Sequence, residues 1–463
     1  MQHSSYFFCG IGGSGMSALA QLLASRGIRV FGSDRSFDRG ETPNKFAALK
    51  EQGIVLCPQD GTGVTADTGV LVVSTAVEDS VPDVRAAKNH GIPIRRRAEI
   101  LADVFAAHTV RIAIGGTSGK STVTGMLGHI LQKLDKDPTV IGGAVTLGAA
   151  SSGGLGNVIA GSGDICVIEA DESDGSIELY RPSVSVLTNL TLDHLPMERL
   201  RELFSIFLDR SDHAIVNIDD PGSEALCSAC GSLVTFSLGK PNANICATEF
   251  EPKANGCSFL LEGTAVELSV PGQHNVSNAL AAIAVCGTMG IDPVIAARAL
   301  SDFPGMKRRL ETAGSANGVT VIDDFAHNPD KISASLACLK EFSGRVIVIY
   351  QPHGFAPTRL CRDGLIDAFA EGLDGEDILI MPEIYYAGGT AAKDISSMEL
   401  VEEISARNIN SHYIQGRDAI SNFVLGECRQ GDRIIVMGAR DDTLSVFARN
   451  ILDRIRAAHA SGS

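Results

Sequence analysis

The sequence has no long apolar run, because none of its hydrophobic stretches approaches the roughly 20 residues that a membrane-spanning helix needs. Positive charge is also scarce: 39 lysines and arginines face 55 aspartates and glutamates, which leaves a formal net charge of −16. Such a balance argues against nucleic acid as a partner, since its phosphates would be repelled. Heptads, solenoid repeats and low-complexity tracts are missing as well. We therefore expect no membrane segment and no nucleic-acid partner.

An N-terminal export segment is also missing, and eleven cysteines are scattered along the chain. This usage predicts reduced thiols and a cytoplasmic location. Cys227-Ser-Ala-Cys230 has the spacing of a redox or metal site, but it lacks a second pair or a nearby histidine, so we interpret it as a packed helical segment. The dense basic run Arg95-Arg96-Arg97 is interpreted as a solvated loop.

What is present is a long alternation of strand and helix patterns. A chain of 463 residues predicts about three domains, and its 49 glycines suit tight turns between strands and helices. We predict an α/β fold with a Rossmann-like domain at 1–108, a central parallel-sheet domain at 109–311 and a second Rossmann-like domain at 312–463. The expected strands include 6–9, 28–31, 69–74, 92–94, 109–114, 164–169, 183–188, 214–218, 319–323, 345–350, 378–381 and 433–437, and the expected helices include 16–25 and 397–406.

The most informative stretch is Ala-Ile-Gly-Gly-Thr-Ser-Gly-Lys-Ser-Thr at 113–122. A glycine-rich turn between a buried strand and a helix presents backbone N–H groups to phosphate, while Lys120 reaches the outer phosphates and the Ser121 hydroxyl suits Mg²⁺. The usual pattern has glycine six residues before the lysine, where this chain has Ile114. The match is therefore to a variant P-loop, and it predicts a protein that uses ATP. The alternative is an ordinary strand-to-helix turn.

A second glycine motif, Gly10-Ile-Gly-Gly-Ser-Gly15, follows the first strand and opens a helix. Asp34 lies about 20 residues further on, at the end of the next strand, which is the spacing of a dinucleotide-binding fold. Taken alone, the motif suggests NAD and an oxidoreductase. The fingerprint indicates a diphosphate at a helix N-terminus more firmly than it indicates nicotinamide, so other nucleotide diphosphates also fit.

Carboxylates gather after the expected strand 164–169, in Glu169-Ala-Asp171-Glu172-Ser-Asp174. At the carboxyl end of a strand such groups suit Mg²⁺. The segment 142–163, rich in glycine, alanine and serine, is expected to form a loop beside the nucleotide.

Seven ordered motifs together resemble the ATP-dependent Mur ligases of cell-wall synthesis, and the resemblance spans nearly the whole chain. The motifs lie at 10–17, 116–122, 169–174, 188–194, 272–279, 307–311 and 323–329. The resemblance implies that a carboxylate is first phosphorylated by ATP and that an amine then attacks the acyl phosphate. It also implies a UDP-N-acetylmuramate-type sugar nucleotide and an amino acid or peptide as substrates, in a monomer or homodimer. Closure of the C-terminal domain over ATP is expected.

The resemblance assigns roles residue by residue. It implies catalytic roles for Lys120, Glu172, His194 and Arg309, and metal binding by Ser121, Glu172 and His194. ATP contacts are expected from Gly116, Thr117, Ser118, Gly119, Lys120, Ser121, Thr122, Asn278, Arg309 and Asp324, and contacts with the UDP end of the sugar nucleotide from Gly10, Gly12, Gly13, Ser14, Gly15, Asp34, Ser74 and Thr75. The amine is expected near His327, His353 and Arg359.

Several of these residues also have structural interpretations. His194 fits a hydrogen-bonded turn, and Glu172 fits a charge at a helix N-terminus. Asp324 and His327 fit a turn before Pro329, and His274 fits a helix cap, as does the following Asn275.

Departures from the family pattern leave the amine open. No lysine lies between His194 and Lys240, where several relatives carry a carbamylated one, and this gap favours the alanine-adding branch. Gly354 and Pro357 stand where that branch has arginines, and Ala326-His327-Asn328 resembles the diaminopimelate- or lysine-adding relatives. The L-alanine-adding step is the leading hypothesis. The alternatives are a murein tripeptide recycling ligase, a Mur-like ligase with a different amine, an NAD-dependent oxidoreductase and a non-catalytic nucleotide-binding switch.

Overall fold

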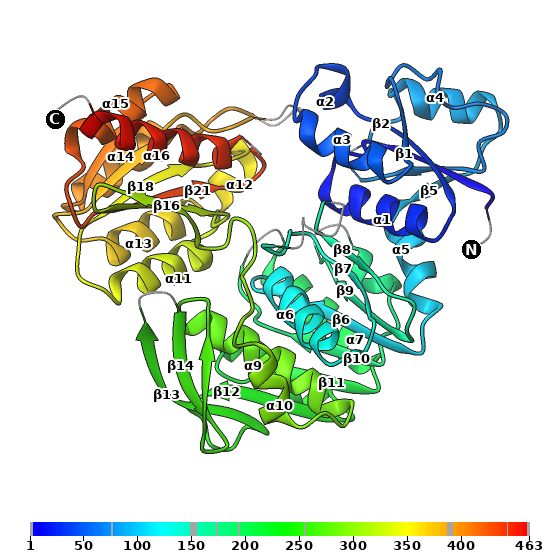
Figure 1. Cartoon of the computed structure of the whole chain (residues 1–463), viewed down its shortest axis with the longest axis horizontal. Coiled ribbons are helices and arrows are strands. Elements are labelled where there is room, and N and C mark those ends of the chain that lie inside the picture. The colour runs from blue at the N-terminus through cyan, green and yellow to red at the C-terminus, as the bar shows by residue number, and fades with distance from the viewer. Residues whose placement is uncertain are drawn as a thin grey trace. The chain divides into compact units, whose positions relative to one another are not determined.

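The computed structural model describes residues 3–75, 77–148, 155–172, 175–192, 195–253, 256–386, 392–441 and 443–460 (Figure 1). The chain forms two compact units. The first consists of Met1–Phe250, Ser258–Ser269 and Asn275–Met306, and the second of Glu251–Cys257, Val270–His274 and Lys307–Ser463. Within the described residues, no helix combines the length and the apolar character that crossing a membrane requires.

A five-stranded parallel sheet opens the first unit, with the strand order β3-β2-β1-β4-β5. Its strands are β1 Ser5–Cys9, β2 Arg29–Ser33, β3 Val55–Cys57, β4 Val70–Val73 and β5 Ile94–Arg96, and its helices are α1 Ser14–Ser25, α2 Arg35–Asp38, α3 Pro43–Glu51, α4 Pro82–Asn89 and α5 Arg97–Ala106. Every residue of β1 is buried, as expected for a central parallel strand covered on both faces. The strands after β1 are added first on one side of it, as β2 and β3, and then on the other, as β4 and β5, so a ligand crevice is expected at the carboxyl ends of β1 and β4.

A ten-stranded sheet follows, in the order β15-β14-β13-β12-β11-β10-β6-β9-β7-β8. Its strands are β6 Val110–Gly115, β7 Thr139–Ile141, β8 Val158–Ala160, β9 Ile165–Glu169, β10 Val184–Leu187, β11 His213–Asn217, β12 Leu233–Leu238, β13 Ile245–Lys253, β14 Gly256–Leu261 and β15 Thr264–Leu268. The accompanying helices are α6 Lys120–Lys133, η2 Ser176–Leu179, α7 Met197–Asp209, α8 Pro221–Glu224, η3 Cys227–Ala229, α9 Gln273–Thr288 and α10 Pro293–Ala299. Because β6 pairs in parallel with both β9 and β10, the loops after these three strands lie at one edge.

The second unit is built on a six-stranded sheet with the order β16-β17-β21-β18-β19-β20, in which β16 is antiparallel and the remaining pairs are parallel. Its strands are β16 Glu311–Ala316, β17 Val319–Asp324, β18 Val346–Gln351, β19 Ile378–Met381, β20 Asn410–Tyr413 and β21 Arg433–Gly438. Its helices are α11 Pro329–Lys340, α12 Phe355–Leu360, α13 Arg362–Gly372, α14 Ser397–Ala406, α15 Arg417–Glu427 and α16 Leu444–Ala460. Two apolar clusters bury the two faces of this sheet.

The predicted α/β alternation is confirmed, and β19 and α14 have the predicted bounds. Two predictions are wrong. The segment 142–163 is not a loop throughout, because β8 lies within it and pairs antiparallel with β7. The run of three arginines is not a solvated loop either, because Arg95 and Arg96 belong to β5 and Arg97 begins α5. The domain bounds 1–108, 109–311 and 312–463 stay a prediction.

Five cysteines are buried: Cys9, Cys166, Cys257, Cys286 and Cys338. Burial raises the pKa of each of these thiols to about 12. Cys227 and Cys230 pack against the core around η3, as the sequence predicted. In the part of the chain that the structure describes, no cysteine forms a disulfide.

Candidate active site

The loop between β6 and α6 has the backbone of a phosphate cradle. Gly116 and Gly119 adopt φ angles of +124° and +89°, which favour glycine. A Cβ on Gly116 would lie 2.0 Å from Thr188 Oγ1, and one on Gly119 would lie 2.5 Å from Asn278 Oδ1. Both positions therefore favour glycine for their conformation, and Gly116 also for space, because the Asn189 backbone lies 3.1 Å from its Cβ position. Asn278, which was predicted to contact ATP, is thereby placed beside this loop.

The loop is held from outside by the segment after β10. Asn189 Oδ1 accepts hydrogen bonds from Thr117 Oγ1 (2.7 Å) and from the Ser118 amide (2.8 Å). Thr188 Oγ1 donates to the Ser118 carbonyl at 2.6 Å, and Thr191 Oγ1 lies 2.8 Å from Thr117 Oγ1. Sequence reasoning used this segment only for His194 and missed its supporting role. Asp193 and His194 themselves lie outside the described residues.

The Lys120 ammonium donates hydrogen bonds to two acceptors. Its Nζ donates to Glu172 Oε2 at 2.8 Å and to the Gly116 carbonyl at 2.5 Å, and the Glu172 side chain is only 3% exposed. Burial alone would lower the pKa of Lys120, but the Glu172 and Asp171 carboxylates raise it above its ordinary value. The ammonium is therefore charged at neutral pH. Glu172 is a buried partner of this lysine and not an exposed charge at a helix terminus.

Ser121, the residue after Lys120, contacts a second carboxylate, that of Glu169. Ser121 Oγ donates to Glu169 Oε2 at 3.0 Å, and Glu169 Oε1 accepts from the Gly143 amide at 2.5 Å. Among the described residues, no three His, Cys, Asp or Glu side chains form a cluster that could hold a metal ion. The predicted metal ligands Ser121 and Glu172 have separate partners, because Ser121 contacts Glu169 and Glu172 contacts Lys120.

The donor set fits a nucleoside triphosphate. The cradle has a charged lysine, two glycines with positive φ angles, and a Ser118 hydroxyl that is buried and has no hydrogen-bond partner among the described residues. Hydroxyl and carboxylate oxygens are the ligands that Mg²⁺ prefers alongside phosphate oxygens. Thr122 is buried in the first turn of α6, below the loop.

The first glycine motif forms a second loop, between β1 and α1. Gly10 has φ +80°, and the Ser33 carbonyl accepts hydrogen bonds from the amides of Gly10 and Ile11. Asp34 accepts from the Gly12 amide at 2.8 Å and also caps α2. A Cβ on Gly12 would lie 2.8 Å from the Asp34 carboxylate, so Gly12 makes room for this aspartate.

Two cations that sequence reasoning missed adjoin this loop. Lys45 Nζ donates to the Gly12 carbonyl at 3.2 Å, and a Cβ on Gly15 would lie 3.3 Å from Arg97 Nη1. Lys45 comes from α3, about 30 residues away, so no local pattern connects it with the loop. Arg97 is part of the basic run, which was the one available signal.

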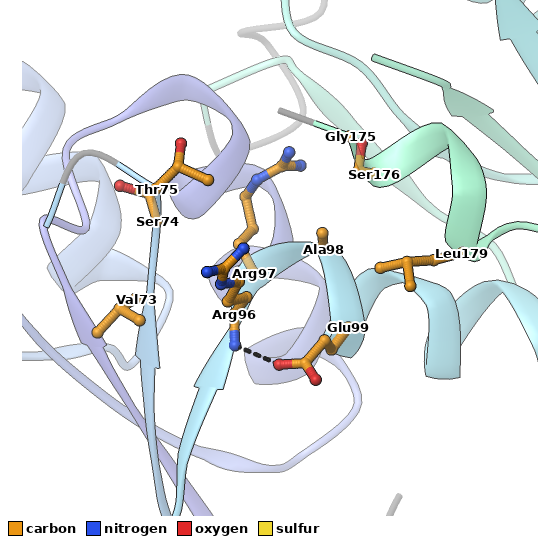
Figure 2. A pocket seen from close by; sticks show the side chains of 10 residues that line it. All are labelled: Val73, Ser74, Thr75, Arg96, Arg97, Ala98, Glu99, Gly175, Ser176 and Leu179. Atoms are coloured by element: carbon orange, nitrogen blue, oxygen red, sulfur yellow. Dashed lines mark hydrogen bonds between the residues drawn. The ribbon is translucent and has the colours of Figure 1, made fainter. Parts of the chain in front are cut away.

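Arg97, which lies next to Gly15 of this loop, also lines a cavity of about 290 Å³, and Figure 2 shows the lining side chains. Ser74 and Thr75, both predicted to contact the UDP substrate, line it together with Arg96 and Arg97. The remaining lining residues are Val73, Ala98, Glu99, Gly175, Ser176 and Leu179. Hydroxyl and guanidinium groups in one cavity favour a ligand with anionic and hydroxylated parts.

The remaining predicted ATP contacts belong to the second unit. The Arg309 guanidinium lies over the Phe325 ring, 4.7 Å from its centroid. Asp324 is 3% exposed, and its carboxylate accepts hydrogen bonds from the Ser335 hydroxyl and from the Phe325 amide. In this structure Asp324 therefore shapes the turn after β17, and its contact with ribose stays a prediction.

Of the three residues predicted to lie near the amine substrate, two histidines contact each other and Arg359 has a different partner. The rings of His327 and His353 are edge to face with centroids 5.3 Å apart, and burial holds the pKa of His327 well below its ordinary value. Arg359 instead forms an ion pair with Asp394. His274 and Asn275 lie inside the first turn of α9, so the structure does not place them as caps before it.

Comparison with known proteins identifies the family. Three family models match in order: "Mur ligase family, catalytic domain" over 5–109, "Mur ligase middle domain" over 114–286 and "Mur ligase, glutamate ligase domain" over 308–440. The UDP-N-acetylmuramate--L-alanine ligase of Nitratidesulfovibrio vulgaris strain DP4 is 36% identical over 93% of this chain and 94% of its own. The chain belongs to the Mur ligase family. As a Mur ligase it is an ATP-dependent ligase, so the oxidoreductase interpretation of the first glycine loop is set aside.

Two further Mur ligases agree over almost the whole chain. The UDP-N-acetylmuramate--L-alanine ligase of Caldicellulosiruptor bescii is 33% identical over 95% of this chain and 96% of its own. The crystal structure of UDP-N-acetylmuramate-alanine ligase from Thermotoga maritima has a TM-score of 0.81 at 27% identity, covering 98% of this chain and 100% of that one. The predicted fold class, with three α/β Mur ligase domains, is thereby confirmed.

Proposed function

We propose that this protein joins L-alanine to the carboxylate of UDP-N-acetylmuramate, the alanine-adding step of peptidoglycan synthesis. The observation that carries the proposal is the charged Lys120 on a P-loop, paired with the buried Glu172, in a chain similar along its length to ligases of that name. A cytoplasmic location accords with the buried, protonated thiols.

The chemistry requires two transfers. An oxygen of the acid attacks the γ-phosphorus of ATP, the bond to the bridging oxygen breaks and ADP leaves. The amine nitrogen then attacks the acyl carbon, phosphate leaves with the carbon–oxygen bond electrons, and the nitrogen loses a proton. No protein nucleophile is needed, so positioning and charge neutralisation carry the catalysis.

The first-unit residues supply these two effects. Lys120 and the first amides of α6 would hold the β- and γ-phosphates, since the Thr117 and Ser118 amides donate to Asn189, and Asn278 would contact the nucleotide beside Gly119. Ser121 and Glu172, with His194, would hold Mg²⁺, which neutralises charge on the transferred phosphoryl group. Binding would exchange the partners of Lys120, because its ammonium, now paired with Glu172, would turn to the phosphates.

The sugar nucleotide would occupy the first glycine loop and the adjoining cavity. The amides at the start of α1 would bind its diphosphate, and Arg97 and Lys45 would add positive charge. Ser74 and Thr75 supply hydroxyls within the same cavity.

A second candidate is a ligase of the murein tripeptide recycling type, or one that adds a different amine. The observation that favours it lies in the second unit, where Gly354 immediately precedes α12, Pro357 lies within it, and Arg359 is occupied by Asp394. The two arginines that would grip a small amino acid's carboxylate are thus replaced, and the nearest remaining one already has a carboxylate partner.

Phosphate release from MgATP tests these candidates. We expect turnover that requires UDP-N-acetylmuramate and L-alanine together. Turnover with a murein tripeptide or another amino acid, but not with L-alanine, would establish the second candidate. Absence of phosphate release with every sugar nucleotide and amine pair would overturn both.

A further inference from the structure

Two buried amide side chains connect the helix of the sugar-nucleotide loop to the ATP-binding layer. Gln21, on α1, is 2% exposed, and Asn157, just before β8, is 5% exposed. Gln21 Nε2 donates to Asn157 Oδ1 at 3.0 Å, although 136 positions separate the two residues in the sequence.

In each of the two side-chain amides, both the oxygen and the nitrogen form hydrogen bonds. Gln21 Nε2 also donates to the Ser17 carbonyl at 3.0 Å, and its Oε1 accepts from the Leu155 amide at 2.9 Å. Asn157 Nδ2 donates to the carbonyl of Ser14, the first residue of α1, at 2.9 Å. A buried polar cluster with its groups satisfied favours one relative placement of the elements that it joins.

The same asparagine connects to the ATP loop through its backbone. The Asn157 carbonyl accepts from the Gly142 amide at 3.0 Å, and the adjacent Gly143 amide donates to Glu169. Glu169 in turn accepts from Ser121, on the first turn of α6. Hydrogen bonds, joined through Asn157 and through the peptide bond between Gly142 and Gly143, therefore connect the start of α6 to the start of α1.

We propose that Gln21 and Asn157 are positioning residues that fix the placement of the sugar-nucleotide loop relative to the ATP loop. This inference rests on the proposed function, in which those loops hold the acid and the phosphoryl donor. A misplacement of the two reacting atoms by about 1 Å can slow attack on phosphorus by about 10²-fold. Neither amide needs to touch a substrate for its loss to slow the transfer.

The test uses the double variant Gln21→Leu/Asn157→Leu, because replacing both partners by apolar groups leaves no polar group of the pair buried alone. We expect kcat to fall by about ten- to a hundredfold. KM for ATP and the Kd of UDP-N-acetylmuramate, measured by calorimetry, should each stay within about threefold, since both loops keep their own contacts. A purely structural role would lower stability without this split.

Two further variants sharpen the test. The exchange Gln21→Asn/Asn157→Gln keeps one long and one short amide and should restore most of the lost kcat. Ser185→Ala is the matched control, because it removes a buried hydrogen bond to Ser211 that joins neither loop, and it should keep the wild-type kcat. If the leucine pair melts below the assay temperature, Asn157→Leu alone gives the same readout, since Gln21 keeps its hydrogen bonds with the Ser17 carbonyl and the Leu155 amide.

The outcomes separate the two proposals. A wild-type protein without turnover on UDP-N-acetylmuramate would overturn the proposed function. An active wild type with a leucine double variant whose kcat matches that of Ser185→Ala would overturn the positioning role alone.

Discussion

At the scale of single residues, the Lys120 ammonium has two roles: it pairs with Glu172 in the fold and is proposed to bind the phosphates of ATP. Lys120 lies 2.8 Å from the buried Glu172 carboxylate, so each stabilises the other in the protein without nucleotide. Removing either one leaves a charge in a poorly solvated place, which is costly. The residue that binds phosphate is therefore also part of the fold's stability.

Lys120→Ala should have two effects. Turnover should fall by at least about 10²–10³-fold, the size expected when a donor to developing charge is lost. The free energy of unfolding should fall by on the order of 3 kcal/mol, because Glu172 loses its partner. Urea unfolding and phosphate release measure these separately.

The double variant Lys120→Met/Glu172→Gln is the control for this prediction. It should recover most of the stability and none of the activity, because it removes both charges together. An unchanged stability of Lys120→Ala would show that the pair does not stabilise the fold.

Gly116→Ala and Gly239→Ala form a matched comparison. Both glycines have positive φ angles, +124° and +108°, but only a Cβ on Gly116 meets a neighbour, Thr188 Oγ1. Gly239→Ala should cost about 1–2 kcal/mol from backbone strain alone. Gly116→Ala should cost more and should also weaken MgATP binding. Unfolding and calorimetry measure the two effects. If both variants had the same stability and Gly116→Ala bound MgATP like the wild type, a Cβ at position 116 would not clash with Thr188.

At the scale of elements, both nucleotide loops follow central parallel strands, β1 and β6, and both lead into helices. These parts were predictable, since each loop is contiguous in sequence and its glycines, strand and helix lie within about 20 residues. The contacts of Lys45, Arg97, Gln21 and Asn157 were not predictable, because each depends on which distant elements become neighbours. β8 was missed because only three residues pair there, in a segment whose composition is typical of a loop.

Helix α9 supports the ATP layer through Asn278 and contains one glycine near its end. A Cβ on Gly287 would meet nothing within 4 Å. Gly287→Ala should therefore raise the free energy of unfolding by about 0.4–1 kcal/mol, through helix propensity and a less flexible unfolded chain. Thermal melting checks the stability, and kcat should be unchanged. A lowered melting temperature would indicate a contact that this helix face does not show.

At the scale of the whole molecule, burial lowers the pKa of a histidine in each unit, His108 in the first and His274 in the second. His274, in the second unit, has its pKa lowered to about 4 by burial, against an ordinary value of 6.5. The unfolded chain therefore takes up a proton at His274 at higher pH than the folded chain does. The stability that this residue contributes is present above pH 6.5 and is lost as the pH falls from 6.5 to about 4.

His274→Gln isolates this effect. The pH dependence of unfolding between 6.5 and 4 should be shallower in the variant than in the wild type, because one buried neutral imidazole is gone. Denaturant unfolding at pH 7, 5.5 and 4 measures it. Parallel curves for the two proteins would show that His274 is solvated and titrates normally.

The five buried thiols can report unfolding, because each becomes reactive only when the core around it is exposed. A thiol with a pKa of about 12 carries almost no thiolate near neutral pH, so an alkylating reagent cannot mark it while the surrounding core is closed. Cys9, Cys166 and Cys286 lie in the first unit, whereas Cys257 and Cys338 lie in the second. Mass spectrometry after a labelling pulse would therefore time the exposure of each unit independently, without any engineered probe.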